Sequence, residues 1–160
     1  MGDVIAIRPA TPDDVDVIEG MWQELAAQHG TYDAGRWDFA PDAGARWRKA
    51  FVESMKLEST LVRVAEDGRG RRLGFLWATM GDATPQMAYR RMGTINDLFV
   101  VPGGRCRGIG GRLVTAAAEE LKRRGAECLT LLVATANERA IGFYKRLGMK
   151  ASSQQMFMRL

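Results

Sequence analysis

The sequence is poor in the side chains that bind metals and form disulfides. Its 160 residues include two cysteines, Cys106 and Cys128, and one histidine, His29. Two cysteines cannot build a disulfide framework, and together with one histidine they fall short of the four ligands of a structural zinc site. His29 precedes Gly30, a position typical of a residue at the end of a helix, so a Cys–His catalytic pair is disfavoured. No metal is predicted.

Long apolar runs are absent as well. No stretch approaches the roughly 18 to 20 apolar residues that span a bilayer. The start Met1-Gly2-Asp3-Val4 lacks the basic and then apolar segments of a signal peptide, and Ala6 stands where a myristoylation motif requires Ser or Thr. We therefore expect a cytoplasmic protein without a membrane partner.

Composition favours one globular domain over residues 1–160. Hydrophobic residues make up 46% and charged residues 26% of the chain, which is typical of a folded protein of this length. The net charge of +4 is modest and rests mainly on arginine, a side chain suited to phosphate binding. Without a nucleic-acid motif or a basic stripe interleaved with aromatic residues, the charge points to a small anionic ligand, and no nucleic-acid partner is expected.

The order of hydrophobic periods predicts a mixed sheet with helices on both faces. Thr11-Pro12-Asp13-Asp14 is typical of a helix start, and the helical pattern that follows ends at Gly30. A clear helix starts at Ile109 and stops at Gly125. The remaining predicted elements are a short apolar start at 5–9, a loop at 30–44, a helix at 45–56, strands at 60–66, 73–80, 94–101, 128–134 and 149–160, and a helix from Asn137 to Leu147.

A glycine-rich loop joins the strand ending at Val101 to the helix that starts at Ile109. It reads Pro102-Gly103-Gly104-Arg105-Cys106-Arg107-Gly108-Ile109-Gly110-Gly111. Free N–H groups and the positive end of the helix dipole make such a junction an anion site, and glycine lets a phosphate approach the backbone. The alternative, a tight turn before a glycine-rich helix start, is disfavoured because each glycine inside a helix costs about 1 kcal/mol relative to alanine.

Two well-known phosphate loops do not fit this segment. A Walker loop requires Lys and then Ser or Thr after Gly108, where Ile109 and Gly110 stand instead. A dinucleotide fingerprint requires Gly or Ala at position 113, which is Leu113, and a place in an N-terminal βαβ unit. Nucleotide triphosphatase and dinucleotide-binding activities are therefore disfavoured.

The remaining pattern resembles the GNAT superfamily of N-acetyltransferases over most of the chain. It consists of an apolar strand ending in Leu98-Phe99-Val100, then Arg105-x-x-Gly108-x-Gly110, and then Asn137-x-x-Ala140-x-x-Phe143-Tyr144-x-x-Leu147-Gly148. The resemblance implies a GNAT-like α/β fold, with a mixed, mostly antiparallel sheet of six to seven strands and about four helices. It also implies acetyl-CoA as co-substrate and, as in many relatives, a homodimer.

The resemblance further implies a role for each matching residue. The backbones of Leu98, Phe99 and Val100 would contact the pantetheine arm, and an N–H group among them would polarise the thioester carbonyl. Backbone N–H groups from Arg105 to Gly111 would bind the pyrophosphate. The segment comprises Arg105, Cys106, Arg107, Gly108, Ile109, Gly110 and Gly111, with Arg105, Arg107 and Arg112 either adding charge or serving as ordinary surface arginines.

Asn137, Tyr144 and Asp97 are the candidate side chains. Asn137 would lie near the pantetheine amides and also caps a helix. Tyr144 would protonate the departing thiolate, or alternatively be a core tyrosine with a bonded hydroxyl. The attacking amine must first lose a proton, and Asp97 is our candidate base. Many relatives have a glutamate near this place, so a purely structural role for Asp97 is an equal alternative. In that case a chain of water molecules would remove the proton from the amine. Gly142, inside the last helix, suggests close packing against the cofactor.

The predicted reaction is direct acetyl transfer to a primary amine in a ternary complex, with no covalent enzyme intermediate. Two alternatives stay open, namely a catalytically silent acyl-CoA-binding module and a nucleic-acid-binding protein. The acceptor amine, a small molecule or a protein, is not specified by the sequence. Its binding lip is expected from the segments 30–44 and 81–92, which contain Tyr32, Trp37, Phe39, Met87, Tyr89 and Arg91.

Overall fold

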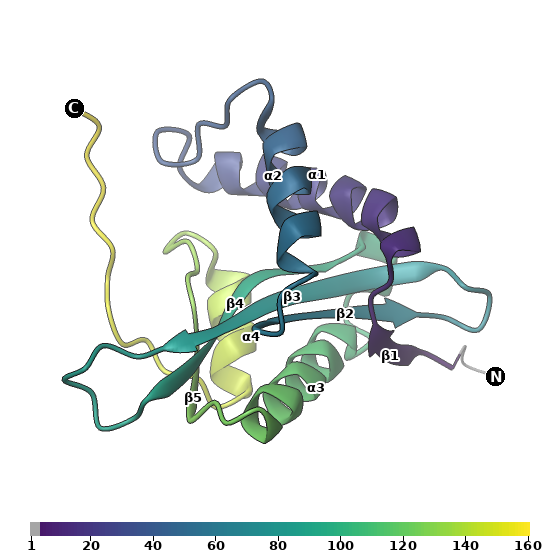
Figure 1. Cartoon of the computed structure of the whole chain (residues 1–160). Coiled ribbons are helices and arrows are strands. Elements are labelled where there is room, and N and C mark those ends of the chain that lie inside the picture. The colour runs from purple at the N-terminus through teal and green to yellow at the C-terminus, as the bar shows by residue number, and fades with distance from the viewer. Residues whose placement is uncertain (1–3) are drawn as a thin grey trace.

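The protein folds around one five-stranded sheet in the order β1-β2-β3-β4-β5. The computed structural model describes residues 4–160, so residues 1–3, three of the four used to judge a signal peptide, lie outside the described part. All neighbouring strands are antiparallel except β4 and β5, which are parallel (Figure 1). The strands are β1 Ala6–Pro9, β2 Thr60–Glu66, β3 Arg72–Asp82, β4 Arg91–Val100 and β5 Cys128–Leu131.

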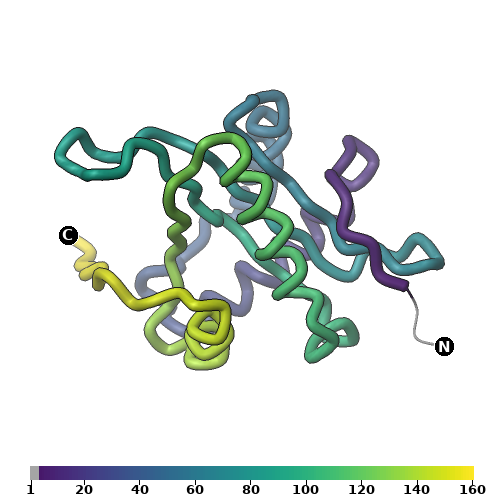
Figure 2. The backbone as a smooth tube through the Cα atoms, turned by 90° about the horizontal axis from the view of Figure 1, so that it is seen from below, coloured from purple at the N-terminus to yellow at the C-terminus, as the bar shows by residue number. Residues whose placement is uncertain are grey.

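Four α-helices cover the sheet from two sides. Helices α1 (Val15–Tyr32) and α2 (Ala43–Ser54) lie on one face, and α3 (Ile109–Arg123) crosses the opposite face (Figures 1 and 2). The last helix, α4 (Glu138–Arg146), follows β5. Short 3-10 turns at Pro12–Asp14 and Pro102–Gly104 precede α1 and α3. Within residues 4–160, no helix is long and apolar enough to cross a membrane.

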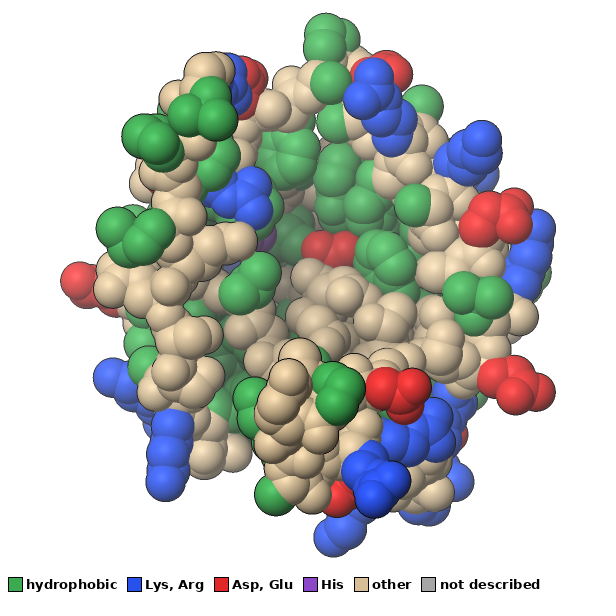
Figure 3. All heavy atoms as spheres, turned by 60° about the vertical axis from the view of Figure 1, so that its left-hand side comes forward, with side chains coloured by type: hydrophobic (Ala, Val, Ile, Leu, Met, Phe, Trp, Pro, Cys, Tyr) green, Lys and Arg blue, Asp and Glu red, His purple; other side chains and the backbone are tan. Residues whose placement is uncertain are grey.

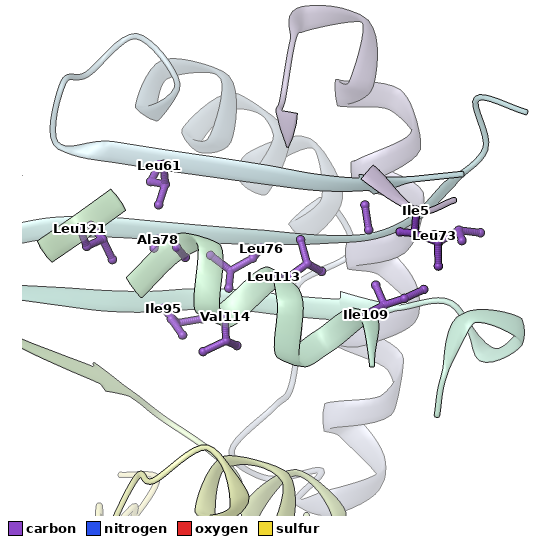
Figure 4. Packing of buried hydrophobic residues seen from close by; sticks show 12 residues of the cluster. Ile5, Leu61, Leu73, Leu76, Ala78, Ile95, Ile109, Leu113, Val114 and Leu121 are labelled. Atoms are coloured by element: carbon purple, nitrogen blue, oxygen red, sulfur yellow. The ribbon is translucent and has the colours of Figure 1, made fainter. Parts of the chain in front are cut away.

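The sheet divides the core into two apolar clusters. One cluster joins Ile18 and Trp22 of α1 and Phe51 of α2 to Phe75 and Phe99 of the sheet. The other joins the apolar stripe of α3 to the opposite face, where its side chains meet those of the strands (Figure 4). The members of this second cluster drawn there include Leu61, Leu76, Ala78, Ile95, Ile109, Leu113, Val114 and Leu121. Burial of both faces fixes the strand register, because a one-residue slip would turn each apolar side chain outward.

A buried ionic network holds the start of α1 against the edge of the sheet. The Asp14 side chain is fully buried and accepts hydrogen bonds from Arg8 at 2.7 and 2.9 Å, from Arg72 at 2.9 Å, and from the Thr11 N–H at 2.8 Å. The bond with Arg8, first among these contacts, holds the pKa of Asp14 well below its usual range. The predicted helix start is confirmed, and its acidic residue serves tertiary structure as well as capping.

The sequence prediction was wrong on the number of strands and on the chain end. Residues 4–160 contain five strands in place of the expected six to seven, and residues 149–160 form no strand. The tail lies instead beside the α1–α2 loop, where Arg159 pairs with Asp38 at 3.0 Å and Arg36 stacks 5.5 Å from the Phe157 ring. Alternating apolar residues predicted a strand, but Met156 and Met158 remain 83% and 76% exposed, so no apolar surface pairs with that pattern.

Smaller differences concern element boundaries. Helix α1 continues past Gly30 to Tyr32, and α2 starts at Ala43, so the predicted loop is shortened from both ends. Strands β3 and β4 extend further into the 81–92 connection than expected, which leaves residues 83–90 to connect them. Strand β5 stops at Leu131 rather than continuing to Ala134.

Candidate active site

Strands β4 and β5 separate halfway along the sheet. They pair only from Met92 with Cys128 to Ile95 with Leu131, after which β4 continues to Val100 without a neighbour on that side. A bulge in the β3–β4 pairing lies at the same point, because Asp97 faces Trp77 while Ile95 faces Ala78. The extra residue, Asn96, increases the local twist of the strand. A gap with one exposed strand edge therefore opens beyond Ile95.

The predicted segment Leu98-Phe99-Val100 forms this edge, but its three backbones do not face the same way. The Val101 N–H donates to the Leu73 carbonyl at 2.9 Å, and Phe99 is the register partner of Phe75. Because backbone groups alternate sides along an antiparallel strand, those of Leu98 and Val100 point away from β3 and into the gap. Phe99 instead packs its side chain into the α1–α2 core.

The glycine-rich loop places the start of α3 at the end of this gap. Gly108 is the N-cap residue, with a left-handed φ of 73° that glycine adopts without strain. The first α3 hydrogen bond runs from the Arg112 N–H to the Gly108 carbonyl at 3.1 Å. Among the described residues, the N–H groups of Ile109, Gly110 and Gly111 have no partner, as expected for a first helical turn. Unpartnered N–H groups at the positive end of a helix dipole are typical of sites that bind anions.

The loop arginines are used differently from one another. The Arg105 Nε donates to the Val100 carbonyl at 3.0 Å, and its guanidinium lies 5.6 Å from the Phe99 ring centre. Arg112 donates to the Ile5 carbonyl at 2.7 Å. Both arginines therefore brace the loop and helix within the protein. Cys106 is exposed and adopts a left-handed φ of 61°, which tightens the turn before Gly108.

Gly110 is required by packing as well as by its place in the loop. A Cβ atom there would lie 3.2 Å from Cζ of Phe143, so the bare backbone lets α4 approach α3. Gly108 has open space where its Cβ would be, so its glycine is explained by the left-handed φ and not by packing. At Gly142, a Cβ would meet only the Arg146 side chain at 3.6 Å, so packing within the described protein does not explain that glycine.

Helix α4 lines the opposite side of the gap. Its N-cap is Asn137, whose Oδ1 accepts the Ala140 N–H at 3.1 Å, so the predicted capping role is confirmed. Tyr144 packs its ring against Phe143. No described residue bonds its hydroxyl, and burial raises the pKa of Tyr144 to about 12. The ring packs against the buried core cluster, as the alternative of a core tyrosine predicts, but the hydroxyl has no partner within residues 4–160. The raised pKa keeps the phenol protonated throughout the neutral range.

A cavity of about 310 Å³ lies where the gap meets α1 and the α1–α2 loop, and Figure 3 shows this face hollowed, with hydrophobic side chains around an acidic one. Asp97, Tyr144 and Asn137 all line it, so the structure brings the three candidate side chains together. The rest of its lining comes from Trp22, Leu25, Ala26, His29, Trp37, Phe39, Thr94, Ile95, Asn96, Leu98, Leu131, Leu132, Val133 and Ala140.

Asp97 sits in a largely apolar environment. Its Oδ2 accepts a 3.2 Å hydrogen bond from Nε1 of Trp47, and no described cation forms a salt bridge with it. Burial raises the pKa of Asp97 above its ordinary value, opposed more weakly by the Trp47 bond and by the charge of His29. A carboxylate that is partly desolvated holds a proton more readily, which is the property a base requires.

The sequence did not predict that His29 lines the cavity. Of the two segments expected to form the lip that binds the acceptor, only one contributes to the cavity. His29 Nδ1 lies 2.8 Å from the Leu25 carbonyl, which can only accept, so Nδ1 carries a proton. Trp37 and Phe39 line the cavity as predicted. Tyr32 instead accepts a hydrogen bond from Gln28 at 2.7 Å, and the 81–92 segment, with Met87, Tyr89 and Arg91, takes no part.

Comparison with known proteins agrees with this geometry. Residues 20–149 match the model of the acetyltransferase (GNAT) family, and the chain belongs to that family. It is 34% identical over 103 residues to YhfO, an uncharacterised N-acetyltransferase of Bacillus subtilis, covering 62% of this chain and 66% of YhfO. It is 30% identical to the streptothricin acetyltransferase of Streptomyces lavendulae, covering 92% of this chain and 82% of that enzyme.

The fold matches solved structures as well. The tetramutant of the BH1408 protein of Bacillus halodurans superposes with a TM-score of 0.85 at 25% identity, covering 97% of this chain and 99% of that one. The predicted GNAT-like fold is thereby confirmed, apart from its strand count.

Proposed function

We propose that the protein transfers the acetyl group of acetyl-CoA to a primary amine within the cavity between α1, β4 and α4. One observation carries this function: the exposed edge of β4 runs from the unpartnered N–H groups of α3 to the cavity that holds Asp97 and Tyr144. Each part of acetyl-CoA has a counterpart in this arrangement. The helix start suits the pyrophosphate, the strand edge suits the extended pantetheine arm with its amides, and the two titratable groups lie at the end where the thioester would be.

The binding residues divide the co-substrate between them. The N–H groups of Ile109, Gly110 and Gly111 hold the pyrophosphate at the start of α3. The pantetheine arm lies along β4 and bonds the backbone of Leu98 and the N–H of Val100, because the Val100 carbonyl already accepts from Arg105. Asn137 lies beside this arm while its Oδ1 caps α4.

The catalytic residues move two protons. Acetyl-CoA supplies an activated thioester. Asp97 accepts a proton from the substrate ammonium, either directly or through water, and the free amine attacks the thioester carbonyl. The Leu98 N–H stabilises the negative charge that develops on the carbonyl oxygen. The C–S bond then breaks, and Tyr144 donates its proton to the departing thiolate while the new amide nitrogen loses its second proton, which returns to the tyrosinate directly or through water. The products are CoA thiol and the acetylated amine, and Asp97 releases its proton to solvent.

The names of relatives support an amine acceptor. The S. lavendulae relative is named for the acetylation of streptothricin. The proposed reaction requires no nucleophilic side chain of the enzyme, so no acetyl group should remain on Cys106 or any other residue after incubation with acetyl-CoA alone.

The experiment that tests this function measures CoA thiol release in the presence of a panel of primary amines. We expect release that depends on both acetyl-CoA and an amine, with acetylated amine formed in equal amount. A silent acyl-CoA-binding module would bind CoA without any turnover, and a stable acetylated enzyme would contradict direct transfer.

A further inference from the structure

The part of the cavity that faces α1 is walled by aromatic rings. The rings of Trp37 and Phe39 lie 6.1 Å apart, the Phe39 ring meets Trp22 edge-on at 5.9 Å, and the His29 ring lies 4.5 Å from Trp37. Phe39 is 42% exposed. Because an exposed aromatic side chain beside a cavity offers apolar surface to a ligand, this wall favours an acceptor with an apolar group.

The wall is held rigidly. Trp22 stacks on Trp47 with ring centres 5.0 Å apart, and Trp47 stacks in turn on the fully buried Phe51 at 4.7 Å. Trp47 also donates its Nε1–H to Asp97. The same aromatic stack therefore supports the apolar wall and fixes the carboxylate, so that the distance between an acceptor's apolar group and its amine is constrained.

The charged side chains that line the cavity also discriminate between possible acceptors. Asp97 is the one acidic side chain among its lining residues, and no lysine or arginine among the described residues lines it. The Arg36 guanidinium lies 4.8 Å from the Trp37 ring, but Arg36 is not a lining residue, and it also stacks on Phe157 of the tail. An ammonium group finds a carboxylate and aromatic faces here, whereas an acceptor carboxylate would lose water, meet the Asp97 carboxylate, and find His29 as the one lining side chain that can carry a positive charge.

The volume sets the size of the acceptor. About 310 Å³ is close to the lower limit of small-molecule sites, which span roughly 300 to 1,000 Å³, and the end of the co-substrate shares this space. A single ring with a short side chain fits such a site better than an oligosaccharide or a peptide segment.

We propose that the acceptor is a small monoamine that carries an aromatic or branched apolar group and no carboxylate, such as a 2-arylethylamine. This inference rests on the proposed acetyltransferase function and narrows its acceptor class. The ring occupies the wall formed by Trp22, Trp37 and Phe39, and the amine lies at Asp97.

The test compares amines that differ by one group. With saturating acetyl-CoA, 2-phenylethylamine should have a kcat/KM about 10- to 200-fold above that of ethylamine, which lacks the ring, since this is the range over which apolar contacts discriminate. Phenylalanine, which adds only a carboxylate to 2-phenylethylamine, should be a poorer acceptor by at least a similar factor. Lysine and kanamycin complete the panel as polar, multiply charged acceptors.

Variants connect the selectivity to the wall. Trp37→Ala should lower kcat/KM for 2-phenylethylamine about tenfold or more, mainly through KM, and leave ethylamine nearly unchanged, while Trp37→Phe should restore most of the loss. Trp37→Arg should raise the relative use of phenylalanine, because it adds the missing cation. Met87→Ala is the matched control, since Met87 is exposed in the β3–β4 hairpin loop and lines no part of the cavity.

The outcomes of these experiments distinguish a failure of the proposed acceptor class from a failure of the proposed acetyltransferase function. Preference for phenylalanine, lysine or kanamycin over 2-phenylethylamine would overturn the acceptor class and leave the acetyltransferase function standing. Equal use of ethylamine and 2-phenylethylamine, or no effect of Trp37→Ala, would overturn the role of the aromatic wall. Failure to acetylate any amine in the panel would overturn both proposals.

Discussion

Replacing Asp97 with asparagine should lower the acetyltransferase activity without lowering the stability of the fold. Asparagine keeps the shape of the side chain and an oxygen that accepts the Trp47 N–H, but it cannot take a proton from an ammonium group. A positioned general base typically contributes 10²- to 10⁴-fold to a rate, which corresponds to about 2.7 to 5.4 kcal/mol of barrier. We expect kcat to fall by that factor. CoA affinity should change little because the unpartnered N–H groups of α3 belong to a separate part of the site.

The stability of the Asp97→Asn variant should be equal to or higher than that of the native protein at neutral and alkaline pH. Burial raises the pKa of Asp97, so the folded state disfavours its charged form. The corresponding contribution to stability is fully present below the unfolded pKa of about 3.9 and is lost as the pH rises through the raised, folded value. Asp97→Asn removes the buried charge, and its melting temperature should equal or exceed that of the native protein at pH 8, with the advantage shrinking towards pH 4.

Two assays check this prediction together. Thiol release at saturating acetyl-CoA and amine gives kcat, and thermal unfolding at pH 4 and pH 8 gives the stability difference. A variant that is less stable at pH 8 and proportionately less active would show that Asp97 is a structural carboxylate, and the reasoning about the base would be refuted. Full activity in a stable variant would leave a water chain or another group as the base.

Three further changes test other parts of the structure. Tyr144→Phe should lower kcat about 10²- to 10⁴-fold while CoA still binds, and in the native enzyme the pKa of about 12 predicts no loss of rate from Tyr144 ionisation below about pH 11, which a pH–rate profile would check. Asp14→Asn should cost about 1 to 3 kcal/mol of unfolding free energy in urea, because Arg8 and Arg72 lose a buried, hydrogen-bonded partner while both keep Glu66. The depressed pKa of Asp14 means that its contribution is present above the unfolded value of about 3.9 and is lost at lower pH, so the two proteins should converge in acid. Gly74→Ala should destabilise the fold by roughly 1 to 3 kcal/mol in the same assay, since its Cβ would lie 2.6 Å from the Phe99 carbonyl oxygen, and an unchanged urea midpoint would contradict this close approach.

The elements that were predicted correctly from the sequence are those whose start, end and buried face are all specified by residues close together in the chain. Helix α3 combines an apolar stripe, basic residues in its last turn and Gly125 just beyond it, and its predicted start at Ile109 is confirmed. Asn137 is confirmed as a cap because its bond to the Ala140 N–H depends on residues only three positions apart. The family resemblance rested on the order of such motifs, and it is confirmed by the match over residues 20–149.

The features that sequence missed depend on contacts between distant segments. The tail at 149–160 alternates like a strand, but strand formation depends on an available neighbour, and the pair Arg159–Asp38 joins residues far apart in the chain. His29 has the local signature of a helix end, and its place in the cavity follows only from the packing of α1 over β4. The hydrogen bond from Arg112 to the Ile5 carbonyl could not be foreseen either, because these residues lie 107 positions apart in the chain.

The central claim is that the start of α3 binds the pyrophosphate of CoA, and calorimetric titration of CoA into matched glycine variants tests it most directly. Gly108 and Gly125 both adopt a left-handed φ, at the start and just beyond the end of α3, so valine at either position strains the backbone in the same way. We predict that folded Gly108→Val loses CoA binding, because the side chain enters the open space beside the unpartnered N–H groups, whereas Gly125→Val binds as the native protein does. Undiminished binding by folded Gly108→Val, or no binding by the native protein, would contradict the account.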